Sequence, residues 1–510
     1  MIILVLFLTL LCAHPDVSAQ APDRGSTVFN MDLTTILLNN NEITHENSTY
    51  IQRIDACFEL NRPLIEPSRG RAYFAMGATD HEFTALTNIR NYVTRCMRGT
   101  PYNEFMLHNP SATTADYLQS SLDETEELIA HYKRQLFELK GDAIEGSPMP
   151  VISRIDNGDL QPYYLRGRGN FWFTTIHQLE HHVEQILHLV HKELLPIEFL
   201  QYGMNIRYKI VPAIAQALAK DCVYFGKKDR SEGCPDDIRV SYYMLDDWMI
   251  REMYGLHNKL VYSAVEAPAV FGSALAVNPE LDFEGIQDAY FRGDVLQIDN
   301  LLTPAALYNI RKVALESTTF FDSKVGYLGS YMDDGLQSVW IMKLARELQE
   351  LMPRVLKDQA LRQAWFYKYD IGSEDENYSR GIKVHADLAR VNLNIWLTPD
   401  EANLDPSSGG LLIYDTLPGS DEFEASNFAD WNNWENVNDM MTYLKESDAK
   451  ITKVTNKQNR CAMFNSALLH ETDQFKFKEG YENRRINLTL LFGLDTQVEE
   501  KPTGVLTKFE

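Results

Sequence analysis

The chain has 510 residues, with 72 acidic and 48 basic side chains and a formal net charge of −24. Its length predicts two or three domains, and 45% hydrophobic residues supply enough apolar side chains for real cores, which excludes a disordered chain. An acidic surface repels phosphate backbones, so we expect no nucleic-acid partner.

The first apolar run, at residues 2–13, is too short to span a bilayer and is followed by Val17, Ser18 and Ala19. We interpret residues 1–19 as a signal peptide that is cut after Ala19, which predicts the secretory pathway and secretion. An uncleaved N-terminal anchor is the alternative. No later segment is long and apolar enough for a membrane span, so we expect none after signal removal.

Five cysteines follow the predicted signal peptide. In an oxidising compartment Cys57–Cys96 and Cys222–Cys234 are reasonable disulfide pairs, which would leave Cys461 free. The sequence alone does not determine this connectivity.

Three Asn-x-Ser/Thr sequons occur in the chain. Those at Asn47 and Asn377 lie in polar stretches and are candidate glycosylation sites. The third, at Asn487, lies in a strand that we expect to be buried, so we interpret it as a chance match.

The N-terminal half is expected to be largely helical. Residues 20–140 form a first helical region, with 114–139 as its best example, and 141–170 is rich in turn residues and reads as a linker or irregular segment. Residues 171–287 are expected to form a helical domain, with helices near 171–195, 204–220 and 240–262.

The helix expected at 171–195 carries an unusual polar stripe. Its members share one face at helical spacing, and they are His177, His181, Glu184, His188 and His191. Histidines four residues apart can bind zinc, so the stripe is a candidate metal site or pH-sensitive interface. A solvated helix face or a contact between domains is the plainer interpretation, which we favour.

The pattern changes at about residue 288, where the third region, 288–510, begins. Residues 295–298 read as a strand, and Thr303 with Pro304 predicts the start of a helix. From residue 363 onward the apolar runs are short, branched or aromatic and separated by turn residues. Such runs indicate a β-sandwich or jelly roll, so the fold class is α+β with a helical N-terminal region.

His385 and Asp387 are two residues apart, so on a strand both side chains point to one face and can meet one metal ion. His470 follows Asp387 by 83 positions. Two histidines and one carboxylate leave three positions of the metal open, which is the ligand set of non-haem Fe(II) oxygenases. The H-x-D triplet by itself is weak, because His14 and Asp16 repeat it inside the predicted signal peptide.

A downstream arginine adds to this constellation. Residues 485–489 read as a strand with Arg485, Asn487 and Thr489 on one face and Ile486 and Leu488 on the other. A guanidinium inside a barrel is costly unless a carboxylate pairs with it. We therefore expect Arg485 to bind the distal carboxylate of a co-substrate.

This combination of H-x-D, a distant His and R-x-N-x-T resembles the 2-oxoglutarate/Fe(II)-dependent dioxygenase superfamily, over roughly residues 288–495. The R-x-N-x-T ending is similar to that of the nucleic-acid demethylases. The layout of a secreted chain with helical N-terminal blocks and a C-terminal oxygenase domain is closer to prolyl 4-hydroxylases. The resemblance implies that residues 288–510 form a double-stranded β-helix (jelly-roll) oxygenase domain.

Carried over to this chain, the resemblance implies that His385, Asp387 and His470 hold Fe(II). It also implies that Arg485 binds the distal carboxylate of 2-oxoglutarate, with O₂ as the second co-substrate and ascorbate as the reductant.

Other residues near these motifs have weaker assignments. Arg484 would point to the face opposite Arg485. Tyr369 is the best match to a tyrosine that touches the co-substrate, and Tyr367 is the second. Asn392 and Asn394 share one face of the next strand, where they either line the pocket or are hydrogen-bonded polar residues of a barrel.

The sequence therefore predicts a 2-oxoglutarate- and Fe(II)-dependent oxygenase. Prolyl hydroxylases carry Lys where this chain has Arg485, which favours a small molecule as the substrate. The enzyme would hydroxylate or oxidatively cyclise this molecule, for example an amino-acid derivative, in a specialised-metabolite pathway. A peptide or protein side chain is the alternative substrate. A catalytically dead oxygenase fold that acts as a binding protein, and a zinc hydrolase with the same three ligands, stay open. The sequence does not determine the oligomeric state.

Overall fold

The computed structural model describes residues 98–140, 173–219, 239, 243–267, 274–324, 326–332, 335–357, 359–370, 381–387, 389–417, 437–493 and 502–510. Several predictions fall outside these described residues: the signal peptide, the region from residue 20 to 97, the linker at 141–170, the sequons at Asn47 and Asn377, and Cys57, Cys96, Cys222 and Cys234. Secretion and the disulfide pairs therefore stay predictions from the sequence. Within the described ranges, no helix combines the length and apolar character that crossing a membrane requires.

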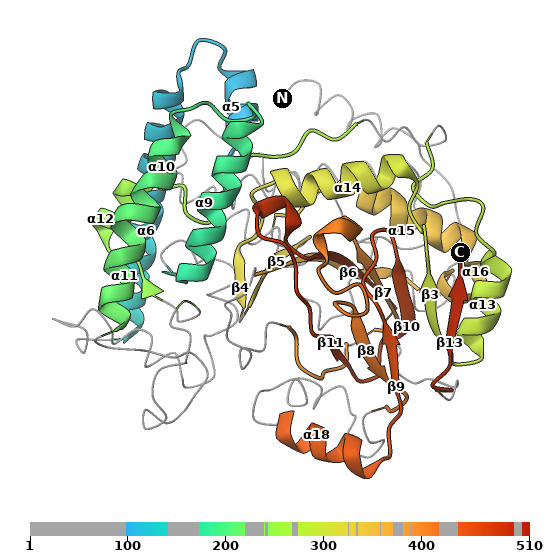
Figure 1. The fold of residues 1–510 in the computed structure, drawn as a ribbon. Helices are drawn as coiled ribbons and strands as arrows, with labels where there is room; N and C mark the ends of the chain where they lie inside the picture. Colours follow the sequence, from blue (N-terminus) through green and yellow to red (C-terminus); the bar gives the residue numbers. More distant parts are fainter. Residues whose placement is uncertain are drawn as a thin grey trace, which may run out of the picture.

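Helices build the first part of the described chain, residues 98–267, which we call the helical block. Their bounds are α5 Tyr102–His108, α6 Thr114–Lys140, α9 Ile176–His191, α10 Phe199–Asn205, the π-helix Ile206–Ile210, α11 Val211–Leu218 and α12 Asp247–Glu252. Helix α9 begins after Thr175, whose hydroxyl accepts a 3.1 Å hydrogen bond from the N–H of Gln178. Apolar side chains from these helices form one buried core, and the block lies to one side of the sheets in Figure 1.

The helix predicted at 240–262 is wrong in its length. Helix α12 covers only Asp247–Glu252, and the residues after it turn away. Tyr254, Gly255 and Asn258 have φ angles of 51°, 63° and 55°. Left-handed backbone of this kind cannot continue a right-handed helix. The predictions at 114–139, 171–195 and 204–220 overlap α6, α9 and the run from α10 to α11.

The C-terminal part is built on strands. Among the described residues these form a large sheet in the order β13-β3-β10-β7-β12-β6-β5-β4, a small sheet in the order β11-β8-β9, and the pair β1-β2 in the helical block. The bounds are β1 Phe173–Thr174, β2 Tyr243–Met244, β3 Val295–Ile298, β4 Asp322–Lys324, β5 Tyr327–Tyr331, β6 Leu361–Tyr369, β7 Val391–Trp396, β8 Leu411–Tyr414, β9 Ile451–Val454, β10 Cys461–Asn465, β11 His470–Thr472, β12 Ile486–Phe492 and β13 Leu506–Phe509. The strand predicted at 295–298 is confirmed, as is the α+β class.

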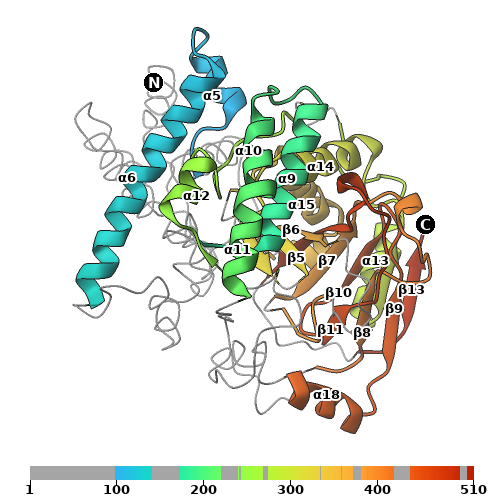
Figure 2. The same cartoon turned by 60° about the vertical axis from the view of Figure 1, so that its left-hand side comes forward.

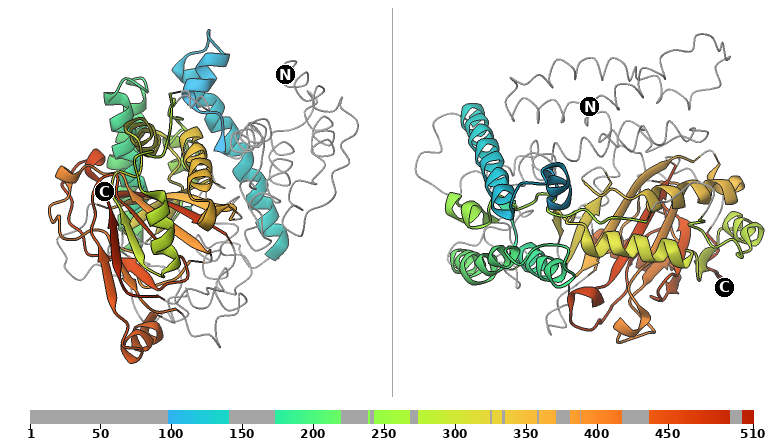
Figure 3. Two further views of the ribbon diagram at one scale, coloured as in Figure 1. Left: turned by 90° about the vertical axis from the view of Figure 1, so that its right-hand side faces the viewer. Right: turned by 90° about the horizontal axis from the view of Figure 1, so that it is seen from above.

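Helices cover one face of the large sheet, as Figure 1 and the view from above in Figure 3 show. They are α13 Phe283–Phe291, α14 Pro304–Glu316, α15 Val339–Leu351 and α16 Pro353–Leu356, while α18 Val437–Glu446 lies apart from them. Helix α14 begins as predicted, because the Thr303 hydroxyl accepts a hydrogen bond from the N–H of Ala306 and Pro304 occupies the first turn. These helices and the sheet share the largest buried core.

The opposite face of the large sheet packs against the small sheet. Trp396 of β7 is fully buried in a core with Leu411 and Ile413 of β8. Asn487 of β12 pairs in register with Trp396, so its side chain lies on this inner face. Ile486 and Leu488 belong instead to the core under the helices, which confirms the predicted alternation along β12.

Helix α9 is one part of the helical block that meets the strand-built C-terminal part (Figure 2). It packs on α14 and on the 3-10 turn Tyr481–Asn483 that precedes β12. Buried polar contacts tie the two parts together: Gln178 donates to the carbonyl of Phe321 at 3.1 Å and Gln185 to that of Ser317 at 3.0 Å. The helical block is therefore joined to the sheets through buried hydrogen bonds.

Candidate functional site

The three predicted metal ligands come from two segments that the fold brings side by side. His385 and His470 exchange backbone hydrogen bonds of 3.0 and 2.8 Å, which form an isolated bridge at the end of β11. Asp387 is held by its own N–H, which donates to the carbonyl of Ser466 at 3.1 Å. The H-x-D triplet lies on this bridge and the irregular segment directly after it, not on the regular strand that we expected.

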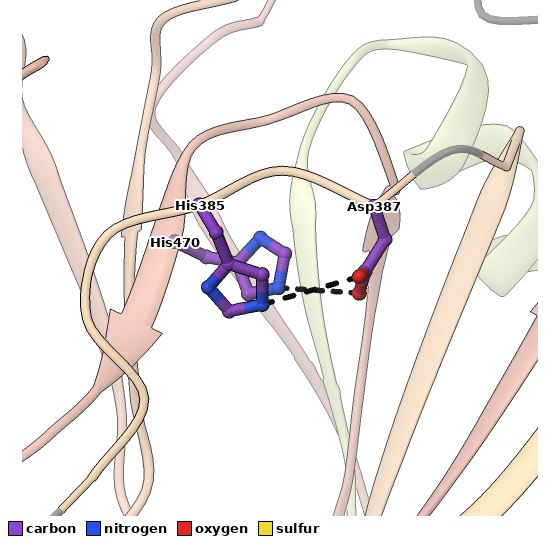
Figure 4. Close-up of side chains that lie close together, drawn as sticks. All are labelled: His385, Asp387 and His470. Carbon is purple, nitrogen blue, oxygen red and sulfur yellow. Dashed lines mark ion pairs between the residues drawn. The ribbon is translucent and has the colours of Figure 1, made fainter. Parts of the chain in front are cut away.

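The ligand atoms of His385, Asp387 and His470 all lie within 4.8 Å of one another. Figure 4 shows the two imidazole rings and the carboxylate facing each other. Nε2 of His385 is 4.0 Å from Oδ1 of Asp387, and Nε2 of His470 is 3.5 Å from Oδ2. Among the residues that the structure describes, this is the group of His, Cys, Asp or Glu side chains that could hold a metal ion.

Backbone carbonyls fix the orientation of both imidazoles. Nδ1 of His385 lies 2.8 Å from the carbonyl oxygen of Lys383, and Nδ1 of His470 lies 2.8 Å from that of Leu468. A carbonyl only accepts, so each Nδ1 carries the proton and each Nε2 keeps its lone pair on the side of Asp387. Second partners of this kind commonly orient metal-binding histidines.

The charge states also suit a divalent cation. Burial, and then the neighbouring His470, lower the pKa of His385 to about 4, so its ring is neutral at neutral pH. Burial would raise the pKa of Asp387, but its contacts with the His470 and His385 imidazoles and the hydrogen bond from Asn392 outweigh burial and lower that pKa. The group therefore offers two imidazole nitrogens and one carboxylate, the donor set that we expected for Fe(II).

A ladder of side-chain amides connects Asp387 to the strand of Arg485. Nδ2 of Asn392 donates to Oδ2 of Asp387 at 2.9 Å, and Nδ2 of Asn394 donates to Asn392 at 3.0 Å. Nδ2 of Asn487 donates to Oδ1 of Asn394 at 2.7 Å. The interpretation of Asn392 and Asn394 as hydrogen-bonded polar residues is therefore confirmed, and Asn392 contacts the predicted metal ligand Asp387, while the interpretation that they line a pocket stays a prediction.

Arg485 is 2% exposed and its guanidinium lies on the inner face with this ladder. Its Nε donates to the carbonyl of Gly409 at 2.7 Å, its Nη2 to that of Gly410 at 3.2 Å, and its Nη1 to Oδ1 of Asn487 at 3.4 Å. All three partners are neutral. Among the described residues no carboxylate forms an ion pair with Arg485; the Asp473 carboxylate acts on it only at longer range, so the buried guanidinium has no carboxylate in direct contact.

Tyr369 lies closer to this guanidinium than Tyr367 does. The ring of Tyr369 packs against Arg485 with its centroid 4.2 Å from Cζ, and Phe475 packs on the same group at 5.5 Å. The hydroxyl of Tyr367 instead lies 3.2 Å from that of Tyr331. The structure thus puts the tyrosine that we preferred next to the arginine.

Arg484 points to the opposite face, as predicted, and lies 3% exposed between α9 and the large sheet. The polar stripe of α9 is buried at its N-terminal end, where His177 and His181 are 1% and 0% exposed. Glu184 and His188 are partly exposed and His191 is exposed. A solvated helix face is therefore wrong for the buried end of the stripe, where a contact between parts of the chain is right. Among the described residues these histidines do not form a group that could hold a metal.

Two further predictions concern single residues. Asn487 is 3% exposed, which confirms that its sequon lies in a buried strand. Cys461 is free and buried within the described part of the chain, in line with the expectation that it has no disulfide partner.

Sequence reasoning missed the residues that seat Arg485 from other segments. These are the carbonyl groups of Gly409 and Gly410 and the ring of Phe475. A Cβ on Gly410 would run into the backbone oxygen of Val454, so the close approach of these strands requires glycine there. The Gly-Gly pair before β8 was a visible signal, but nothing local said which side chain its carbonyls would meet.

No known family profile matches the chain, and no curated protein matches its sequence. Solved structures do resemble it. One is the non-haem α-ketoglutarate-dependent epimerase SnoN from nogalamycin biosynthesis, with a TM-score of 0.29 and 14% identity over 42% of this chain and 87% of that one. HygX from Streptomyces hygroscopicus, with nickel and 2-oxoglutarate bound, has a TM-score of 0.27 and 15% identity over 41% and 86%.

The viral collagen prolyl hydroxylase from Paramecium bursaria Chlorella virus-1 has a TM-score of 0.24 and 14% identity over 38% of this chain and 93% of that one. The chain resembles the 2-oxoglutarate/Fe(II) oxygenases. Because these TM-scores are below 0.5, the similarity does not indicate which reaction this chain performs or on which substrate.

Proposed function

We propose that this chain is a 2-oxoglutarate- and Fe(II)-dependent oxygenase whose iron is held by His385, Asp387 and His470. The observation that carries the proposal is the buried guanidinium of Arg485, which has no carboxylate partner among the described residues. A co-substrate with a distal carboxylate supplies that partner, and a guanidinium is suited to bind a carboxylate through two parallel hydrogen bonds.

The order of the strands supports a double-stranded β-helix. From β6 onward the chain alternates between the sheets: β6 is in the large sheet, His385 bridges to β11 at the small sheet, and β7 returns to the large sheet. Strands β8 and β9 then lie in the small sheet, β10 in the large, β11 in the small and β12 in the large. Two facing sheets built this way would enclose the inner face on which the amide ladder lies.

We also propose domain limits. Val277 and Ile286 belong to the same buried core as β12, so we start the oxygenase domain near residue 274 and not at 288. The helical block before it is a separate core that is joined through α9.

When bound, the iron and 2-oxoglutarate together would supply O₂ activation coupled to decarboxylation. The protein's own residues would hold and orient these groups: the histidine Nδ1 contacts fix the ligand rings, and Arg485 and Tyr369 fix the far end of the co-substrate. The burial of Arg485 would keep water away from the co-substrate end of the site, while His385 and Asp387 stay 19% exposed at the metal end.

For the substrate we propose a small molecule that is hydroxylated or oxidatively cyclised. The support is the arginine itself, because the collagen-type prolyl hydroxylases that the layout resembles carry lysine there. A peptide substrate is the alternative, and incubation with host extract followed by a search for mass gains of one oxygen or losses of two hydrogens separates the two.

The test of the proposed activity is succinate release from 2-oxoglutarate with Fe(II) and ascorbate. We expect His385→Ala to reduce it by more than about 100-fold, beyond the usual effect of outer-shell partners. His108→Ala, the same change at an exposed position of α5, is the matched control. Turnover that survives in His385→Ala would sink the iron assignment, and hydrolysis of a substrate with zinc and without O₂ would favour the hydrolase.

A further inference from the structure

Two neighbouring strand ends place consecutive residues on opposite faces of the large sheet. Tyr369 ends β6 and is followed by Asp370, while Arg484 and Arg485 lead into β12. On the inner face the Tyr369 ring packs on the Arg485 guanidinium at 4.2 Å. On the outer face Arg484 Nη1 lies 3.2 Å from Oδ1 of Asp370. The two pairs therefore share the same stretch of backbone.

Backbone contacts couple the outer pair to the inner one. The N–H of Tyr369 donates to the carbonyl of Arg485 at 2.9 Å. Nη1 of Arg484 also donates to the carbonyl of Tyr369 at 3.3 Å. The side chain of Arg484 thus holds the main chain from which the Tyr369 ring projects, and its own main chain continues into Arg485.

The helical block supplies the remaining partners of this outer pair. Oε2 of Glu184, on α9, accepts a hydrogen bond from Nε of Arg484 at 2.9 Å. His177 lies on the same helix, and its Nε2 is 3.8 Å from Oδ2 of Asp370. Nη1 of Arg239 lies 3.5 Å from that oxygen. Arg484 and Asp370 are 3% and 7% exposed, so their charges depend on these neighbours more than on water.

We propose that the helical block positions Tyr369 and Arg485, the two residues that would hold the distal carboxylate of 2-oxoglutarate. Glu184 is the positioning residue, and it acts on them through Arg484. This inference rests on the proposed function. Without the Glu184 carboxylate, Arg484 keeps one ion pair, with Asp370, and the backbone at Tyr369 and Arg485 is held less firmly. A guanidinium that must meet a carboxylate in one geometry loses affinity when its support loosens.

The experiment measures the Kd for 2-oxoglutarate of the full chain loaded with Ni(II), by calorimetric titration. We expect Glu184→Gln, which keeps the shape and removes the charge, to raise the Kd for 2-oxoglutarate about 3- to 30-fold with the Kd for the metal unchanged. In turnover with Fe(II), KM for 2-oxoglutarate should rise while kcat at saturation stays the same. Glu184→Asp, which keeps the charge, should recover part of the affinity.

The matched control is Glu252→Gln in the same helical block. Glu252 pairs with Lys209 at 2.7 Å within the block, so its loss should leave 2-oxoglutarate binding unchanged. Equal Kd values for wild type, Glu184→Gln and Glu252→Gln would overturn the inference, and so would a lower Tm in Glu184→Gln without a change in Kd. If Glu184→Gln does not fold, His177→Gln tests the same network at Asp370, with a smaller rise expected and no rise contradicting the inference.

The outcomes also separate this inference from the proposed function. If the wild-type chain with Ni(II) binds no 2-oxoglutarate, the proposed function fails and the inference fails with it. If the wild type binds 2-oxoglutarate and Glu184→Gln binds it equally well, the proposed function stands and only the role of the helical block is overturned.

Discussion

Asn392 donates a 2.9 Å hydrogen bond to Oδ2 of Asp387, the carboxylate of the candidate metal centre. Asn392 is fully buried and its own oxygen accepts from Asn394, so this amide has a fixed orientation. The contact ties the metal ligand to the large sheet. The first prediction follows from it.

Asn392→Ala should weaken metal binding by about 10- to 100-fold, because Asp387 would lose the hydrogen-bond donor that orients its Oδ2. The measurement is titration of the apoprotein with Co(II) or Fe(II). Asn109→Ala, at the exposed end of α5 where the side chain bonds only the carbonyl of Phe105, is the matched control. Unchanged metal affinity in Asn392→Ala would show that the hydrogen bond is incidental.

Arg485→Met should raise the Kd for 2-oxoglutarate by at least about 30-fold, since a buried charged partner of the carboxylate is removed. Metal affinity should not change. Arg485→Lys keeps the charge but loses the two-pronged geometry, so we expect an intermediate effect. Arg292→Met, which removes a half-exposed guanidinium paired with Asp294, controls for the loss of any arginine. A wild-type Kd in Arg485→Met would contradict the co-substrate assignment.

Tyr369 provides a pair of variants that differ only in what they remove. Tyr369→Phe loses the hydroxyl, which lies 3.4 Å from Oγ1 of Thr472, but keeps the ring under Arg485. Tyr369→Leu loses the ring and with it a cation–π contact, so KM for 2-oxoglutarate should rise about 2- to 10-fold. We expect Phe to behave like wild type. The reverse order would mean that the hydroxyl, and not the ring, contacts the co-substrate.

Lys368 lies on the helix-covered face of β6 and is fully buried. Its Nζ donates to the hydroxyl of Tyr481 at 2.7 Å and lies 4.0 Å from the centroid of the Phe320 ring. Burial, and then the neighbouring Arg484, lower the pKa of Lys368 well below its usual value. The folded chain therefore binds fewer protons at this site than the unfolded chain between the lowered pKa and the usual pKa of lysine.

Over that interval the wild type gains stability as pH rises, and below the lowered pKa the full cost of a buried ammonium applies. Lys368→Met should thus be as stable as wild type or more stable by up to about 2 kcal/mol, with the advantage largest at low pH and shrinking as pH rises. Denaturant unfolding at several pH values measures it. Lys343→Met is the contrast, because the buried carboxylate of Glu347 would lose the lysine that pairs with it at 3.3 Å. This change should destabilise the folded chain by about 3 kcal/mol. A Lys368→Met advantage that grows with pH would contradict the lowered pKa.

Much of the candidate site could be predicted, because it depends on residue types that are only a few positions apart in the sequence. The alternation Arg485, Asn487, Thr489 against Ile486 and Leu488 follows from strand geometry alone, and the structure has it. The start of α14 at Thr303 and Pro304 is likewise local. The predicted helix at 240–262 failed because tertiary contacts impose left-handed backbone at Tyr254 and Asn258, which composition does not reveal.

The seat of Arg485 could not be predicted, because its partners lie about 75 residues away along the chain, at Gly409 and Gly410. The same holds for the α9 stripe. Amphipathic spacing showed that its histidines share a face, yet spacing does not say whether that face meets water or protein. Glu184 meets Arg484 across 300 positions of sequence, a separation at which only the packed fold determines neighbours.

The sequence by itself determined the candidate ligand set, the strand that carries Arg485 and the inner and outer faces of that strand, because these depend on backbone periodicity and on the chemistry of single side chains. The tertiary structure decided that His385 and His470 share one bridge, that amides link Asp387 to Arg485, and that Glu184 of the helical block reaches Arg484 on the outer face of the large sheet. These contacts depend on how distant segments pack, and the free energy of burying them together is set by the whole fold.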